Sequence, residues 1–245
     1  MNTPPVVSDA SSSDPAMDRY EAVFEVQGDR LVSRHTPEQS AEMLGQACWA
    51  RIVELFPAVM RDEIVQFNLI PGRRWAGQFS GDGKNDLGRT GFSFSVARYV
   101  IEEQDDYDRP TRPLTARRKT LDWTLVHEMG HYICLRSNAI ELFSQAFDGD
   151  MMPQPKRREE PDDYSEDGSP ALDGNFVTSY AERNPGDEEV VETFTTYLLV
   201  DRLPENDSLV AQKIRFFETQ PGFPELRTFV QSIGTPDRPQ IKALP

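Results

Sequence analysis

The chain has 245 residues, which is long enough for one large domain to bury a core without disulfides. Hydrophobic residues make up 38% of it and aromatic residues 10%, too many for a disordered chain, and no apolar run approaches the roughly 18 residues of a membrane-spanning helix. Its 26 basic and 41 acidic residues give a net charge of −15, whose field would repel a phosphate backbone. The sequence therefore predicts a globular protein with neither a membrane span nor a nucleic-acid partner.

The amino-terminal segment, residues 1–17, is rich in Ser, Pro and Asp and lacks the basic start and apolar stretch of a secretory signal. We expect a flexible tail there, followed by a single domain over residues 18–245. The two cysteines, Cys48 and Cys134, allow at most one bridge and have no CxxC spacing. Because a signal could have been removed from this sequence, localisation stays open between the cytoplasm and export. No feature indicates an oligomeric state.

The first part of the chain has one strand pattern and one helix pattern. Alternating apolar residues between Tyr20 and Val26, followed by Gly28-Asp29, indicate a strand and a turn. Thr36-Pro37-Glu38 starts a helix that Pro57 ends, because proline suits the first helical turn. The apolar positions of this helix recur at helical spacing: Met43, Leu44, Ala47, Ile52, Leu55 and Phe56. A second short helix or strand is expected over residues 59–69.

The middle of the chain carries a second strand pattern and a long helix. From Gly91 to Val96, apolar and small polar residues alternate, which predicts a strand with one face buried. Thr115 can cap a helix that runs to about Ser137. Residues 148–174 then become acidic and proline-broken and cannot bury a face, so we expect a solvated loop or flap. A partial calcium-loop pattern within them lacks the glutamate that the last position requires.

The last part of the chain is mainly helical in pattern. In Asn184-Pro185-Gly186-Asp187, the asparagine is expected to cap a helix, the proline to occupy its first turn and the aspartate to reach back as a capping-box acid. An apolar stripe follows to about Arg202, and a last helix is expected over residues 208–218. The stripe consists of Val190, Val191, Phe194, Tyr197, Leu198 and Leu199.

The residues His127-Glu128-Met129-Gly130-His131 form the pattern HExxH. On a helix, histidines four residues apart lie on the same face, so both imidazoles can bind one ion while Glu128 projects beside them toward a metal-bound water. Gly130 lowers helix propensity by about 1 kcal/mol relative to alanine, which indicates that another element packs close to it. The alternative is a chance match on an amphipathic helix. Apolar residues at helical spacing on both sides of the motif favour a zinc site.

A catalytic zinc ion normally has three protein ligands and one water, and the chain has only three histidines. The third ligand must therefore be His35, Cys134 or a carboxylate. A metzincin is excluded, because Cys134 and Ser137 stand where its Gly and His would be. We expect His35 to lie at the surface and Cys134 to pack as a small apolar side chain. Among the carboxylates, Glu188 and Glu192 share one helix face at a spacing of four.

The segment from Phe176 to Phe194 follows HExxH by about fifty residues. It contains Ser-Tyr, then Asn184, then two glutamates and a phenylalanine in the spacing Glu-x-x-x-Glu-x-Phe. This succession resembles the second signature of the anthrax lethal factor catalytic domain and similar bacterial zinc-binding metallopeptidases. The resemblance covers about residues 121–199, and it implies a metallopeptidase of the gluzincin type, whose third zinc ligand is a glutamate.

The resemblance implies roles for four residues: His127, His131 and Glu188 as zinc ligands, and Tyr180 as a group that assists the transition state. One more residue separates Asn184 from the ligand glutamate than in lethal factor itself. Counting forward from Asn184 selects Asp187 as the ligand, whereas counting back from Glu192 selects Glu188. We prefer Glu188, because it is in helical phase with Glu192 and because Asp187 is expected to serve as a cap. Glu192 is expected to orient a histidine.

These residues together predict a zinc-dependent endopeptidase. Its fold would be α+β and zincin-like, with a small twisted sheet over the HExxH helix and a mainly helical carboxy-terminal lobe that supplies Glu188. Glu128 would act as general base toward a metal-activated water and return the proton to the leaving amine, and Tyr180 would stabilise the oxyanion. A protein or peptide substrate would lie extended and antiparallel to residues 92–96.

Two other functions would use the same metal site. One is a non-catalytic zinc-binding sensor or interaction protein, and the other is a regulatory protease that cuts a single cognate partner. The presence of Glu128 counts against the sensor, because a structural zinc site needs the histidines but has no use for the base.

Overall fold

The computed structural model describes residues 19–36, 38–72, 76–81, 83–102, 121–147 and 175–233. The expected tail at residues 1–17 and the expected acidic flap at residues 148–174, with its partial calcium-loop pattern, lie outside the described residues, as does the expected cap Thr115. Among the described helices, none combines the length and the apolar character needed to cross a membrane.

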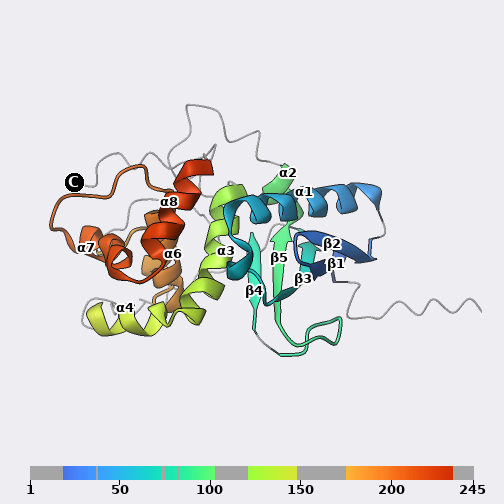
Figure 1. The fold of residues 1–245 in the computed structure, drawn as a ribbon, viewed down its shortest axis with the longest axis horizontal. Coiled ribbons are helices and arrows are strands. Elements are labelled where there is room, and N and C mark those ends of the chain that lie inside the picture. Colours follow the sequence, from blue (N-terminus) through green and yellow to red (C-terminus); the bar gives the residue numbers. More distant parts are fainter. Residues whose placement is uncertain are drawn as a thin grey trace, which may run out of the picture.

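A five-stranded sheet forms one side of the described structure (Figure 1). Its strands are β1 (Ala22–Gln27), β2 (Arg30–His35), β3 (Ile64–Ile70), β4 (Gly77–Ser80) and β5 (Phe92–Ala97). They lie in the order β2-β1-β3-β5-β4, and every neighbouring pair is antiparallel except β3 with β5. The turn predicted at Gly28 joins β1 to β2, and this glycine has the positive φ of 63° that such a turn requires.

The described residues also form eight α-helices, and Figure 1 shows α3 between the sheet and the helices α4, α6, α7 and α8. Their bounds are α1 (Gln39–Leu55), α2 (Arg98–Glu102), α3 (Leu121–Arg136), α4 (Ala139–Phe147), α5 (Ser179–Arg183), α6 (Asp187–Leu199), α7 (Leu209–Phe216) and α8 (Phe223–Ile233). Short 3-10 turns cover Ala58–Met60 and Phe217–Thr219. The α+β class is therefore confirmed, and the zincin-like assignment stays a prediction.

Aromatic side chains fill the space between the sheet and α1. The Phe67 ring centroid lies 6.1 Å from those of Phe24 and Phe94 and 5.9 Å from that of Trp49. A second group of aromatic side chains packs between the carboxy-terminal helices. In it, the ring centroids of Phe194 and Phe217 lie 5.5 Å apart. Helix α3 packs between these two aromatic groups, and its buried residues join them into one hydrophobic core.

The stripe predicted for α1 is wrong at two positions. Met43 is 66% exposed and Ala47 is also exposed, whereas Gly45 and Cys48 are buried. A Cβ atom on Gly45 would lie 2.5 Å from the Phe24 ring, so the helix approaches the sheet through its smallest residue. A pattern read from large apolar side chains alone misses that contact.

The strand predicted at residues 92–96 exists as β5, but both of its faces are buried and both of its edges are paired. Its serines are covered because they belong to a polar layer, in which Asn68 Nδ2 donates to Ser95 Oγ at 3.0 Å. The expectation that a substrate pairs with residues 92–96 is therefore wrong. The edge strand next to β5 is β4.

Candidate metal centre

Helix α3 places the two histidines of HExxH on one face, with ring centroids 5.1 Å apart. The close approach predicted at Gly130 is confirmed, because a Cβ there would lie 3.0 Å from both Val191 Cγ1 and Phe194 Cδ1 of α6. An alanine at this position would require the Val191 or Phe194 side chain to shift. The glycine thus brings the amino-terminal end of α6 within reach of the histidines.

Helix α6 begins differently from the prediction. Asn184 closes α5 instead of capping α6, because its backbone N–H donates to the Tyr180 carbonyl at 2.9 Å and its side-chain amide to the same oxygen at 3.0 Å. The N-cap of α6 is Gly186, whose φ of 97° lies in a region that favours glycine. Asp187 is therefore the first helical residue and forms no capping box.

This start brings Glu188 to the histidines. Glu188 Oε2 lies 3.2 Å from His127 Nε2 and 3.6 Å from His131 Nε2, and the three candidate ligand atoms lie within 4.8 Å of one another. Asp187 instead lies 3.8 Å from the other nitrogen of His131, and its side chain is 61% exposed against 26% for Glu188. The geometry places Glu188 nearer to the histidines than the rival ligand.

The three side chains fit a zinc ion in both chemistry and placement. Two imidazole nitrogens and one carboxylate oxygen form the donor set of many catalytic zinc sites, which leave one position for water. Glu188 Oε2 is buried and, among the described residues, has no hydrogen bond of good geometry. A buried oxygen of this kind requires a partner. A cation at this place would supply one.

Electrostatics keep the Glu188 carboxylate in its ligating form. Burial opposes ionisation, but the adjacent imidazoles of His127 and His131 hold the pKa of Glu188 well below its usual range. Burial would lower the pKa of His127, yet the carboxylates of Glu188 and Glu192 raise it well above its usual value. Because a histidine binds metal only when its ligating nitrogen is deprotonated, protons and metal compete for this site.

Glu192 lies beside the first histidine, at the place where the sequence predicts an orienting acid. Its Oε1 lies 2.9 Å from His127 Nδ1, and its Oε2 accepts a hydrogen bond of 2.7 Å from Thr178 Oγ1. The Thr178 hydroxyl also accepts from Ala181 N–H at 3.0 Å and so caps α5. With Nδ1 directed at Glu192, Nε2 of His127 faces Glu188.

Comparisons of the chain with models of protein families, with curated proteins and with solved structures find no match.

Glu128 and Tyr180 border the same space. Glu128 is buried, which raises the pKa of its carboxyl, and it accepts a hydrogen bond from the Phe79 backbone N–H of β4. Tyr180 on α5 is half-buried, with its ring centroid 6.1 Å from that of His127. An open cleft of about 400 Å³ is lined by all five predicted site residues: His127, Glu128, His131, Tyr180 and Glu188.

The other candidate ligands lie elsewhere. His35 ends β2 and is not part of the cleft, while Cys134 is fully buried with a free thiol whose pKa burial raises. Sequence reasoning did not find Thr178, although a threonine before a short helix is a recognisable capping signal. It also did not find the contribution of β4, for which no local signal exists.

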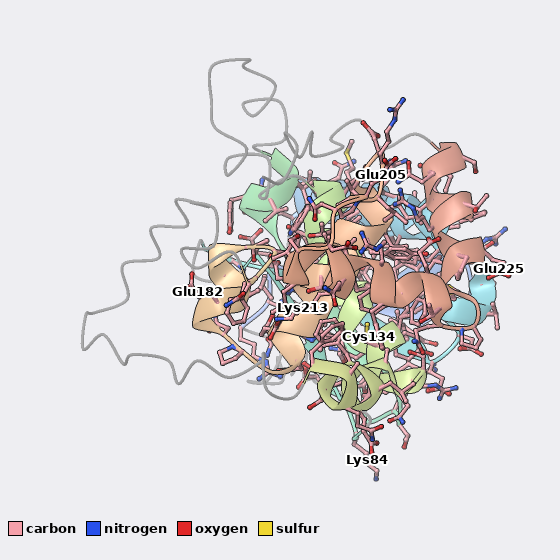
Figure 2. The ribbon with its side chains drawn as sticks, turned by 90° about the vertical axis from the view of Figure 1, so that its left-hand side faces the viewer. Lys84, Cys134, Glu182, Glu205, Lys213 and Glu225 are labelled. Carbon is pink, nitrogen blue, oxygen red and sulfur yellow. The ribbon has the colours of Figure 1, made fainter. Side chains whose placement is uncertain are left out.

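A buried ion pair supports the start of α6 next to Glu188. Lys213 Nζ of α7 lies 2.8 Å from Glu189 Oε1, and both side chains are fully buried. The same ammonium donates to the Asn175 carbonyl at 3.0 Å. In Figure 2, Lys213 lies among the helices, whereas Lys84 projects at the edge of the molecule.

We expect Lys213→Met to lower the free energy of unfolding by about 3–5 kcal/mol, because it removes the buried cation that faces the buried Glu189 carboxylate. The double variant Glu189→Leu with Lys213→Met should recover most of this loss, since it buries no charge. Urea unfolding of both proteins measures the difference. A single variant as stable as the parent would show that the pair contributes nothing to the fold.

Proposed function

We propose that this protein is a zinc-dependent endopeptidase with a zincin-like fold, related to the lethal-factor-like metallopeptidases. The observation that supports it most is the convergence of His127, His131 and Glu188 beside a buried glutamate, Glu128, in one open cleft. A protein that only stored zinc would need the three ligands but not the fourth residue. Among the described residues, no second group of this kind is found.

Each residue of the cleft would have its own role in hydrolysis. Zinc held by the three ligands would acidify a water molecule and polarise the substrate carbonyl. Glu128 would accept the proton of that water and deliver it to the leaving amine, for which its raised pKa is suited. Tyr180 would donate a hydrogen bond to the oxyanion that develops on the former carbonyl. Glu192 would keep His127 oriented.

An extended substrate would bind along β4 and not along β5. The Ala97 N–H of β5 donates to the Ala76 carbonyl at 2.9 Å, and main-chain groups in an antiparallel pair alternate between the two sides of a strand. Gly77 and Phe79 therefore direct their main-chain groups away from β5. A peptide added to this edge would be held by main-chain hydrogen bonds, which favours an endopeptidase over an esterase.

We expect Tyr180→Phe to lower kcat by about 10²–10³-fold with little change in KM, because an oxyanion donor acts mainly in the transition state. Tyr20→Phe is the matched control, since the Tyr20 hydroxyl donates to Asp86 far from the cleft. Steady-state kinetics with a fluorogenic peptide give both constants. If Tyr180→Phe behaves like the control, Tyr180 only packs against His127.

A peptide-library digestion separates this function from its two rivals. Zinc-loaded protein is incubated with the library, and the cleaved bonds are found by mass spectrometry, with Glu128→Gln as the blank. Cleavage of many sequences supports an endopeptidase of broad use. Cleavage of a single sequence class supports a regulatory protease with one cognate partner, and no cleavage by protein that binds zinc supports the sensor.

A further inference from the structure

Strand β4 makes direct contact with the proposed general base. A Cβ atom on Gly77 would lie 2.5 Å from Glu128 Cγ, 2.8 Å from its Cδ and 2.7 Å from its Oε1. Gly77 is not among the glycines with positive φ, so its backbone does not require glycine. The absence of a side chain at Gly77 leaves space in which the Glu128 carboxylate lies.

The same strand binds the carboxylate. The Phe79 N–H faces away from β5 and donates to Glu128, so the base lies at the outward edge of β4. A docking peptide would therefore pair with main-chain groups of this edge other than the Phe79 N–H. The position of the base and the position of the substrate would both be set by one short strand.

We propose that Gly77 is a positioning residue for Glu128, and that Gly77 and the Phe79 N–H together form a slot that fixes the general base. This inference rests on the proposed function for its catalytic meaning. The slot itself is a packing arrangement that is testable without zinc or substrate.

The consequence of filling the slot follows from which atoms would clash. The atoms nearest to an added methyl group all belong to the Glu128 side chain, with Cγ the nearest, and not to backbone. The Glu128 side chain would have to move to admit the methyl group. Gly77→Ala should therefore displace the base and leave the three metal ligands in place.

We expect Gly77→Ala to lower kcat by roughly 10- to 100-fold, since misplacing a catalytic group by about 1 Å has effects of this size. Zinc retention against a chelator and the thermal midpoint should stay at the parent values. Gly83→Ala is the control, because a Cβ there meets nothing within 4 Å and Gly83 does not line the cleft. A kcat equal to that of the control would overturn the catalytic part of the proposal.

Hydrogen exchange of the Phe79 amide tests the slot in zinc-free protein. Because this N–H is directed away from β5, its protection depends on Glu128. We expect its exchange to be at least tenfold faster in Gly77→Ala and in Glu128→Ala, with no further increase in the double variant and no change in Gly83→Ala. Unchanged exchange in Gly77→Ala would overturn the slot. Inactivity of the parent protein would overturn the proposed function instead, and the exchange rates would still decide the role of Gly77.

Discussion

Replacing Glu128 by glutamine is expected to abolish peptide hydrolysis while zinc stays bound. Glutamine has the same shape, and its amide oxygen can still accept the hydrogen bond that Phe79 gives to the carboxylate. It cannot accept and return a proton at neutral pH. General-base catalysis contributes about 10²–10⁴-fold, so the loss should be at least of this order. The proposed metal ligands His127, His131 and Glu188 are not altered by the change.

The measurement is kcat/KM for a peptide together with the zinc content of the same sample. Glu225→Gln is a suitable control, because Glu225 is an exposed residue of α8 that does not line the cleft and that Figure 2 labels at the right-hand edge of the molecule. Activity of Glu128→Gln within tenfold of the parent would refute the general-base assignment. Loss of zinc from this variant would show that Glu128 supports the metal site directly.

Removal of the Glu188 carboxylate should lower zinc affinity by orders of magnitude. Glu188 Oε2 lies 3.2 Å and 3.6 Å from the two histidine Nε2 atoms, so Glu188→Ala would remove one of the three proposed ligands. Asp187→Ala should retain zinc, because Asp187 is exposed and faces the other nitrogen of His131. Its effect on stability should be only about 0.3–1 kcal/mol, since it caps no helix and contributes only a charge at the first turn of α6.

Chelator competition on alanine variants at positions 187, 188, 189 and 192 measures these effects side by side. Glu192→Ala should weaken zinc binding by about 10- to 100-fold, because it removes the partner of His127 and no ligand. If Asp187→Ala loses zinc and Glu188→Ala retains it, the third ligand is Asp187, the residue selected by counting forward from Asn184.

Much of the metal centre follows from local sequence. Histidines at a spacing of four share a helix face wherever the chain is helical, and the apolar residues around them make α3 a buried helix. Helical periodicity also indicates that another element packs close to Gly130 and that Glu188 and Glu192 share one helix face. These features depend on helical periodicity, and the structure retains them.

The remainder depends on contacts between distant segments. Nothing in residues 91–96 shows that β5 is an inner strand, because strand order is decided by pairing with β3 and β4. The start of α6 was misplaced because Asn184 satisfies a carbonyl of α5, a short helix that the sequence analysis did not predict. Gly77 resembles any loop glycine until β4 and α3 are placed together.

Titration of the metal-free protein with zinc, with peptide cleavage followed at each addition, tests the central proposal most directly. We expect activity to rise in proportion to added zinc and to reach its maximum at one ion per chain, bound by His127, His131 and Glu188. Cleavage that persists without metal, or full zinc binding with no cleavage of any peptide, would contradict it.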